Sequence, residues 1–290
     1  MPGKDTDGNP LRWDVFVTPS VPMVGTDLPP GQKQLVWQPT GSTLIYGKRD
    51  AVLVDPFLTV KQTNGLIDWI SASGKNLTTV YITHGHGDHW FGIGAILNRF
   101  SGARAVARSE VVEAMRRQQT PEGRKGWDYL FPGQVPDRLV VADELEGDTI
   151  QLEEEELVSV AVGHADSDHC TVLHVPSVGL VVAGDVAYND THQYLVESPP
   201  PKRREWIAAL DKIASLHPAA VVAGHKRPGR EDTPRVIEET QQYIRDFDRL
   251  DGLSTTTEEL YDQMLRLYPD RVNPGMLWTS ARGAKRVAPS

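Results

Sequence analysis

The sequence predicts one α/β domain in which helices cover the faces of β-sheets, and three observations support this prediction. Short apolar, β-branched runs alternate with segments of helical pattern in both halves of the 290-residue chain. No linker or change of composition separates the halves, and no repeat of solenoid period is present. Hydrophobic residues make up 39% of the chain and charged residues 24%, which is sufficient apolar material for a sizeable core.

Residues 1–40 predict an irregular segment that wraps the surface of the domain. They hold seven of the 21 prolines together with several glycines, and both residue types interrupt regular structure. Short extended pieces are expected within this segment, for example at residues 12–17 and 34–37.

Nine runs from residue 42 onward predict β-strands, because each is short, apolar and rich in β-branched residues. Residues 47–50 (Gly-Lys-Arg-Asp) join the first two runs as a hairpin, and the glutamates at 153–156 fit a solvated turn. The predicted strands are 42–46, 51–54, 80–83, 105–107, 149–152, 157–162, 171–175, 179–183 and 219–223.

Six segments have the apolar spacing of helices, and the first ends at Gly74, which suits the left-handed position after a helix. The predicted helices are 66–73, 92–100, 110–119, 203–216, 234–250 and 256–267. Residues 120–137 mix proline, glycine and charge with three aromatic side chains. We expect an insertion that covers a site, because aromatic groups are costly to leave in water; a poorly ordered loop is the alternative. Residues 282–290 are expected to form a frayed end.

Charge and cysteine content exclude several classes of protein. Thirty Lys and Arg against 39 Asp and Glu give a formal net charge of −9, which disfavours a nucleic-acid or anionic-membrane binder. The single cysteine, Cys170, excludes an internal disulfide and thiolate zinc clusters. No apolar run approaches the roughly 18 residues that cross a bilayer, and the polar N-terminus lacks the apolar region of a secretory signal. We therefore expect a cytoplasmic protein.

Four potential metal ligands lie within six residues, directly after a predicted strand: His84, His86, Asp88 and His89. The intervening glycines allow the tight turns that let these donors converge. Imidazole nitrogen and carboxylate oxygen are ligands that zinc accepts when no thiolate is offered. The pattern therefore indicates a metal site, and a histidine-rich surface turn is the alternative.

A second pattern links two later strands. Val-Val-Ala-Gly precedes Asp185 at residues 181–184, and the same four residues precede His225 at residues 221–224. Each copy predicts a buried strand that ends in glycine and then presents a metal-type ligand.

The H-x-H-x-D-H spacing of residues 84–89 resembles the signature of the metallo-β-lactamase superfamily, and the family's later ligands match His164, Asp185 and His225 in order. The resemblance covers about residues 42–225. It implies an αββα sandwich with the metal site at the sheet edges. We therefore expect a single metallo-β-lactamase-fold domain over residues 1–290, with the irregular segment at 1–40 and a C-terminal helical extension at 251–290.

The resemblance implies a centre of two zinc ions, although other divalent transition metals accept the same ligands. One ion would take His84, His86 and His164, the other Asp88, His89 and His225, and Asp185 would bridge them. His164 is preferred to His169, because His164 follows a glycine as in the family. Asp166 and Asp168 depart from the family's small-residue loop, and either could orient a metal-bound imidazole.

These residues imply hydrolysis. Two zinc ions lower the pKa of a bridging water from ~15.7 to about 7 and polarise a carbonyl oxygen. Relatives that use di-iron for oxygen chemistry usually carry glutamate at the position of His86. Asp88 would accept a proton from the metal-bridging hydroxide and pass it to the leaving group. Cys170 matches no ligand position, unlike the cysteine of the exported zinc enzymes that destroy antibiotics.

Tyr188 follows Asp185 by three residues, a spacing similar to that of the superfamily's quorum-quenching lactonases. In those enzymes the tyrosine hydrogen-bonds the substrate carbonyl or its developing oxyanion; an aromatic packing role is the alternative here. The side chains expected to contact substrate are Trp90, Phe91, Tyr188 and His192, with Phe57 and residues 127–131 as further contributors to an apolar pocket.

We therefore expect a di-zinc metallohydrolase that cleaves a lactone or ester bond of a small, mostly apolar molecule through a metal-bridging hydroxide. A lactam (cyclic amide) or a thioester is the next substrate class. A phosphodiester ranks lower, because a chain of charge −9 attracts phosphate substrates poorly. An inactive metal-binding scaffold is the non-enzymatic alternative. No nucleic-acid or membrane partner is expected, and the sequence does not define the oligomeric state.

Overall fold

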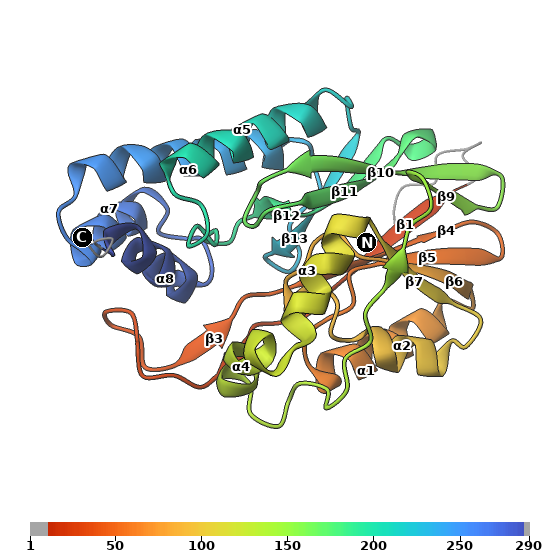
Figure 1. Cartoon of the computed structure of the whole chain (residues 1–290). Coiled ribbons are helices and arrows are strands. Elements are labelled where there is room, and N and C mark those ends of the chain that lie inside the picture. The colour runs from red at the N-terminus through yellow and green to blue at the C-terminus, as the bar shows by residue number, and fades with distance from the viewer. Residues whose placement is uncertain (1–10, 287–290) are drawn as a thin grey trace.

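A six-stranded sheet forms the first half of the fold in the computed structural model, which describes residues 11–286 (Figure 1). In the order β1-β4-β5-β6-β7-β8, its strands span Arg12–Val17, Gly41–Tyr46, Asp50–Val54, Asn76–Tyr81, Arg104–Ala107 and Asp143–Glu144. β4 and β5 pair antiparallel, which confirms the hairpin expected around residues 47–50. The pairs from β5 to β8 are parallel, because helices cross between successive strands.

A five-stranded sheet forms the second half. In the order β13-β12-β11-β10-β9, its strands span Ala220–Lys226, Leu180–Asn189, Cys170–Val175, Glu155–Gly163 and Thr149–Leu152. β12 and β13 are neighbours and run parallel, with Val181 opposite Val221. The two Val-Val-Ala-Gly segments therefore lie side by side. Both strands are buried almost throughout, which explains why their sequences are apolar without alternation.

A separate hairpin is formed by β2 (Val21–Met23) and β3 (Leu35–Trp37). β1 coincides with the extended piece expected at residues 12–17, and β3 lies within the piece expected at 34–37. β2 has no counterpart among the predicted strands, since a proline occupies its centre.

Helices pack on the outer face of each sheet, which confirms the αββα sandwich (Figure 1). The first sheet is covered by α1 (Val60–Ala72), α2 (Ile93–Arg99) and α3 (Ser109–Gln119), and the second by α5 (Pro200–Ala214) and α6 (Arg235–Leu253). The remaining helices are α4 (Pro121–Leu130), α7 (Thr257–Leu267) and α8 (Pro274–Lys285), and two short 3₁₀ turns lie at η1 (Gly87–His89) and η2 (Pro176–Val178).

Alternating side chains along the strands produce three apolar layers. Ile45 points between the sheets, where it belongs to one cluster with Leu173 of the second sheet. Its neighbour Leu44 points the other way and packs under the helices of the first sheet. On the far side, Trp206 of α5 packs with Val181 against the second sheet. The apolar layer between the sheets packs them face to face, so that polar residues of a site can lie at the sheet edges.

The segments that differ in detail from the sequence prediction include residues 120–137 and 282–285. The stretch 120–137 contains helix α4, which starts where the Thr120 hydroxyl accepts the N–H of Gly123, with Pro121 at the first helical position. Helix α8 includes residues 282–285, which were expected to fray. Residues 1–10 and 287–290 lie outside the described part of the chain.

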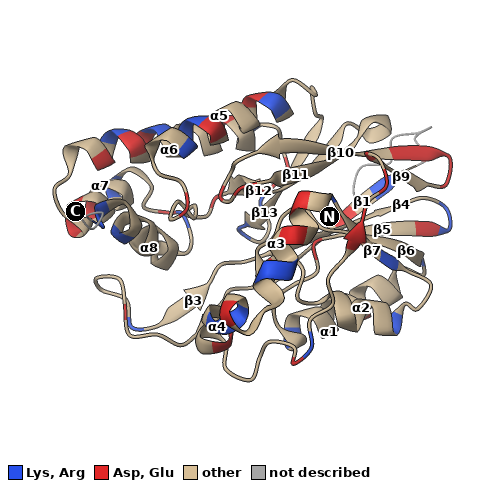
Figure 2. Ribbon diagram, in the orientation of Figure 1, with Lys and Arg blue, Asp and Glu red and all other residues tan. Residues whose placement is uncertain are grey.

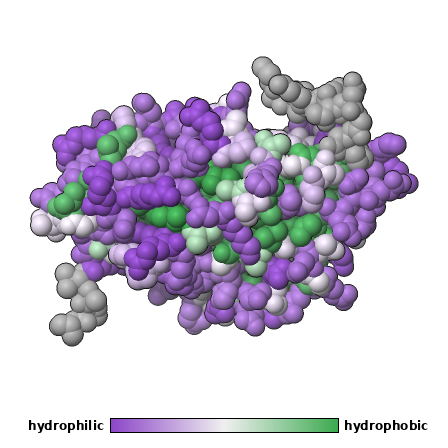
Figure 3. Space-filling model, turned by 90° about the horizontal axis from the view of Figure 1, so that it is seen from above, coloured by the Kyte–Doolittle hydropathy of each residue, from purple (hydrophilic) through white to green (hydrophobic). Residues whose placement is uncertain are grey.

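The outer surfaces of α5 and α6 carry basic and acidic residues in mixture (Figure 2). On the face seen from above, hydrophilic residues surround smaller hydrophobic areas (Figure 3). These helices are therefore amphipathic, with one side in the core and the other solvated. Within residues 11–286, no helix combines the length and the apolar character that crossing a membrane requires.

Candidate metal centre

Metal-type side chains from both sheets meet at one edge of the sandwich. The loop after β6 brings His84, His86, Asp88 and His89, whereas β12 and β13 bring Asp185 and His225. The glycines of the repeated segment make this approach possible. A Cβ on Gly224 would collide with the Asp185 carboxylate, and one on Gly184 would collide with the Thr83 side chain. Six of the seven predicted ligands therefore converge.

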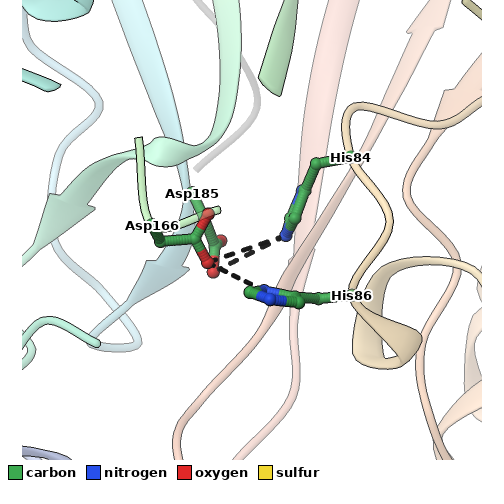
Figure 4. Close-up of side chains that lie close together, drawn as sticks. All are labelled: His84, His86, Asp166 and Asp185. Carbon is green, nitrogen blue, oxygen red and sulfur yellow. Dashed lines mark ion pairs between the residues drawn. The ribbon is translucent and has the colours of Figure 1, made fainter. Parts of the chain in front are cut away.

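The first group of potential ligands is formed by His84, His86, Asp166 and Asp185 (Figure 4). The imidazoles come from the first half of the fold and point at carboxylates from the second half. His86 Nδ1 lies 2.9 Å from Asp166 Oδ2. His84 Nε2 lies 3.9 Å from Asp166 Oδ2 and 4.0 Å from Asp185 Oδ2. One ligand atom from each of the four residues falls within 4.8 Å of all the others.

The second group is formed by Asp88, His89 and His225. Asp88 Oδ2 lies 3.6 Å from His89 Nε2 and 3.3 Å from His225 Nε2. Asp185 reaches this group too, with Oδ1 3.2 Å from His89 Nε2 and Oδ2 3.0 Å from His225 Nε2. Asp185 thus contacts both groups, which is the position that a bridging carboxylate requires.

Each of the four histidines is held by its outer ring nitrogen, so that the inner nitrogen faces the carboxylates. This arrangement fixes the orientation of a ring before a metal binds. The outer contacts are His84 Nδ1 to Thr83 Oγ1 (2.9 Å), His86 Nε2 to Glu197 Oε1 (3.2 Å), His89 Nδ1 to Asp55 Oδ2 (3.0 Å) and His225 Nδ1 to Pro39 O (3.2 Å).

Several ring nitrogens and carboxylate oxygens that face the middle of the centre are suited to coordinate a cation. His84 Nε2, His89 Nε2, Asp166 Oδ2 and Asp185 Oδ1 are buried and make no hydrogen bond of good geometry within the described chain. Leaving such atoms without partners is costly, and a metal ion would coordinate them. Nitrogen and carboxylate oxygen are also the donors that zinc and its neighbours accept. The residues present therefore fit a metal centre.

The charges of the centre also favour a cation. Burial alone lowers the pKa of His225, but the Asp185 and Asp88 carboxylates outweigh it and raise that pKa to about 9. His84 lies farther from the carboxylates, and burial together with the neighbouring His89 lowers its pKa to about 4. The carboxylates thus hold positive charge in the site, and metal ions can supply that charge in place of protons.

His164 lies outside both groups, in contrast to the ligand set expected from the sequence. Its Nδ1 is 2.8 Å from Asp168 Oδ1 and its Nε2 is 2.9 Å from Ser198 Oγ, so both ring nitrogens are engaged. The chain turns at Gly163, where φ is +91°, and places Asp166 in the site instead. The pair of aspartates in this turn was the sequence signal for such a change.

Trp90 and Phe91 lie in the core of the first half and do not line the pocket, in contrast to the sequence-based expectation. The chain turns inward after η1, and the Trp90 indole donates to Gly85 O at 3.0 Å. Phe57 is buried in the same cluster. Trp90 and Phe91 directly follow the histidine motif, but packing under the helices of the first sheet determines where their side chains point.

Tyr188 and His192 are also buried away from the pocket. The Tyr188 hydroxyl donates to Asp185 Oδ2 at 3.0 Å, and its ring packs beside His225. Burial and the adjacent Asp185 raise the pKa of Tyr188, so its phenol keeps the proton that it donates. His192 Nδ1 lies 2.9 Å from the Tyr243 hydroxyl, beneath α6.

The buried His192 is expected to make folding stability depend on pH. Burial and the nearby Arg271 lower its pKa to about 3, whereas an unfolded chain would bind a proton near pH 6.5. Its contribution is complete above pH 6.5 and is lost as the pH falls toward 3. Between pH 7.5 and 5, wild type should lose about 2 kcal/mol more stability than His192→Gln. Denaturant unfolding at the two pH values measures this difference, and equal losses would contradict it.

A pocket of about 490 Å³ opens above the candidate centre. Its walls come from the β2–β3 hairpin, α4, α8 and the segment after β12. The Trp37 indole donates to Asp88 Oδ2 at 3.0 Å and packs edge-on against Trp127, with ring centroids 5.2 Å apart. Apolar wall residues include Met23, Leu35, Trp37, Trp127, Leu130 and Met276.

Apart from the imidazoles of His86 and His225, the polar groups at the pocket are acidic or neutral. Glu197 accepts from His86, and the Tyr194 hydroxyl donates to the same carboxylate at 3.3 Å. No Lys or Arg is among the described residues that line the pocket. Sequence reasoning missed Trp37, Tyr194 and Glu197, because no local pattern relates them to the histidine motif. Residues 127–131 were expected to contribute. Trp127, Tyr129 and Leu130 line the pocket, whereas Phe131 is buried in the core of the first half.

Comparisons with known proteins agree with this architecture. The sequence profile described as the metallo-beta-lactamase superfamily matches residues 35–225. No curated protein matches the chain. Similar solved structures include a metallo-beta-lactamase family protein from Thermus thermophilus, with 19% identity and a TM-score of 0.63, covering 93% of this chain and 91% of that one.

Two further structures have the same fold. A metallo-beta-lactamase from Pontibacter korlensis has 14% identity and a TM-score of 0.58, covering 83% of this chain and 97% of that one. The metallo-beta-lactamase FIM-1 from Pseudomonas aeruginosa, solved in its mono-zinc form, has 18% identity and a TM-score of 0.57, covering 80% of this chain and 98% of that one. At these identities the likeness concerns the fold.

Proposed function

Because this chain belongs to the metallo-beta-lactamase superfamily and therefore to a group of metal-dependent hydrolases, we propose that it cleaves a lactone or ester bond of a small, mostly apolar molecule. The observation that carries this proposal is the position of Asp88 and its neighbours at the floor of an apolar pocket. Two zinc ions are the proposed cofactor, and the cytoplasm is the proposed location.

The residues of the site have distinct parts in this reaction. When bound, the metal pair supplies a nucleophilic water of lowered pKa and polarises the substrate carbonyl. Asp88 lines the pocket, so its carboxylate can take up a proton and release it to the leaving group. The Trp37 N–H holds one oxygen of that carboxylate in place. The apolar walls exclude water from the reacting bond.

The pocket lining favours a neutral acyl substrate. Its apolar residues suit an aliphatic or aromatic group, and a volume of about 490 Å³ suits a small molecule. The nearby Arg282 is paired with Asp27, which lines the pocket. The pocket walls carry acidic groups and no Lys or Arg, so they offer a phosphodiester no lysine or arginine to add to the attraction of the metal pair. A lactam or a thioester remains the second candidate, since the same pocket and metal chemistry accommodate any acyl transfer.

A substrate panel tests the proposal. The protein, loaded with zinc and assayed for metal content, is offered lactones, esters, lactams, thioesters and bis-nitrophenyl phosphate. The largest kcat/KM is expected for a lactone or an ester with an apolar side chain. Preference for the phosphodiester would overturn the substrate order, and full metal content without turnover of any substrate would favour an inactive metal-binding scaffold.

Replacing Tyr188 by phenylalanine tests whether its hydrogen bond to Asp185 supports turnover. The variant loses the hydrogen bond to Asp185, and a hydrogen bond to a charged group contributes roughly 1.5–3 kcal/mol. We therefore expect kcat to fall about 10- to 100-fold, with metal content unchanged. Tyr261→Phe is the matched control, because its buried hydroxyl has no hydrogen-bond partner within the described chain. If the Tyr188→Phe rates stay within about twofold of wild type, Tyr188 serves packing alone.

A further inference from the structure

The turn between β10 and β11 contains two side chains that compete for one position of the metal centre. His164 matches the family pattern, and Asp166 follows it by two residues. Both side chains are buried, at 4% and 0% exposure, so neither is an ordinary surface residue. The hydrogen bonds of the two side chains show which of them faces the metal centre.

Asp166 has the contacts of a single-oxygen metal ligand. Its Oδ1 is anchored within the turn, where it accepts from Ser167 Oγ at 3.2 Å and from Cys170 Sγ at 3.5 Å. Its Oδ2 makes no hydrogen bond of good geometry, yet lies 2.9 Å from His86 Nδ1 and 3.9 Å from His84 Nε2. One oxygen is therefore held by protein, and the other faces the two imidazoles that share the first group (Figure 4).

His164 belongs to a different network. Ser198, which contacts its Nε2, also donates to Ala165 O at 2.9 Å. Asp168, which contacts its Nδ1, is paired with Lys202 of α5 at 3.0 Å. Turning His164 into the site would break both of its own contacts. The histidine instead connects the turn to the start of α5.

We propose that Asp166, and not a third histidine, ligates the metal ion bound by His84 and His86, a proposal that rests on the metal centre proposed above. The centre then contains three carboxylates, from Asp88, Asp166 and Asp185. A carboxylate in place of an imidazole adds a negative charge to the site and replaces a nitrogen ligand by a harder oxygen ligand. Imidazole suits zinc, whereas carboxylate oxygen suits manganese. The first position therefore discriminates less between zinc and manganese than one with three histidines.

Metal binding by four matched variants tests this assignment. Full-length wild type, Asp166→Asn, Asp168→Asn, His164→Gln and Asp166→His are stripped with a chelator and checked for folding by circular dichroism. Metal content is then measured after dialysis against zinc or manganese, and affinities are measured by competition with a chromophoric chelator. Asp168→Asn makes the same chemical change as Asp166→Asn in the same turn. Asp166→His restores the family's residue type.

The assignment predicts that Asp166→Asn retains one ion where wild type retains two. Asp168→Asn and His164→Gln should keep both, with affinities reduced about 10-fold at most, since they change only groups beyond the ligands. Asp166→His should raise the preference for zinc over manganese about 10-fold or more at one of the two sites.

Three other outcomes would each contradict a different part of the proposal. If His164→Gln loses an ion while Asp166→Asn keeps two, histidine is the ligand and the assignment is overturned. An unchanged zinc-to-manganese preference in a two-metal Asp166→His protein would overturn the effect on selectivity. If wild type itself binds no metal, the proposed function fails, which this comparison separates from the failure of the Asp166 assignment.

Discussion

Asp185→Asn is expected to lower kcat roughly a thousandfold and to leave at most one metal ion bound. Asp185 is buried and contacts both groups of the centre, with its oxygens 3.2 Å from His89 Nε2 and 3.0 Å from His225 Nε2. Asparagine removes the negative charge and replaces one oxygen by an N–H donor, which cannot ligate a cation. A thousandfold change corresponds to about 4 kcal/mol of lost transition-state stabilisation.

Metal content and single-turnover rates measure this effect directly. Asp190→Asn is the matched control, because Asp190 lies five residues further on and pairs with Arg227 outside the centre. Asparagine also tolerates the positive φ of that position, +61°. Near-normal turnover of Asp185→Asn with two bound ions would contradict the bridging role.

Asp55→Asn is expected to weaken metal binding and to reduce turnover about a hundredfold while the fold persists. Asp55 Oδ1 accepts the backbone N–H of Thr83 at 2.9 Å, and its Oδ2 faces His89 Nδ1 at 3.0 Å. Asp55 Oδ2 also accepts from the Thr83 hydroxyl at 2.6 Å. Asparagine offers one acceptor oxygen in place of two, so an amide N–H₂ that faces His89 Nδ1 would leave the His89 proton on Nε2, the nitrogen that faces Asp185.

A metal-affinity titration combined with thermal unfolding separates the two parts of this prediction. Asp14→Asn is the control, since Asp14 accepts a hydrogen bond from Tyr46 at the far edge of the first sheet. Thermal unfolding of Asp55→Asn should remain cooperative while its metal affinity falls. An affinity within about threefold of wild type would show that the ring orientation of His89 does not depend on Asp55.

The parts of the site that the sequence predicts are those with local patterns. The cluster at residues 84–89 follows a buried strand, and Asp185 and His225 follow two identical apolar segments. Those segments prove to be neighbouring parallel strands, so residues at their ends meet at one edge of the sheet. Short apolar runs rich in β-branched residues similarly predict most strands of both sheets, since such runs depend only on neighbouring residues.

The parts that the sequence could not predict depend on contacts between distant segments. His164 matches a local glycine-histidine pattern, but Ser198, which engages its ring, lies 34 residues away. Trp90 and Phe91 follow the ligand motif directly, and only the packing of α1 to α3 shows that they point into the core. The contact of Trp37 with Asp88 spans 51 residues, through a hairpin with a proline in one strand. No periodicity encodes such distances.

The candidate centre draws its donors from both halves of the sandwich. The loop after β6 belongs to the first sheet, whereas Asp166, Asp185 and His225 belong to the second. A cation held there cross-links the halves, and it does so only in the folded chain. By mass action, free metal at a thousand times its dissociation constant stabilises the native state by about 4 kcal/mol. Removal of the proposed metal would therefore lower the free energy of unfolding as well as the activity.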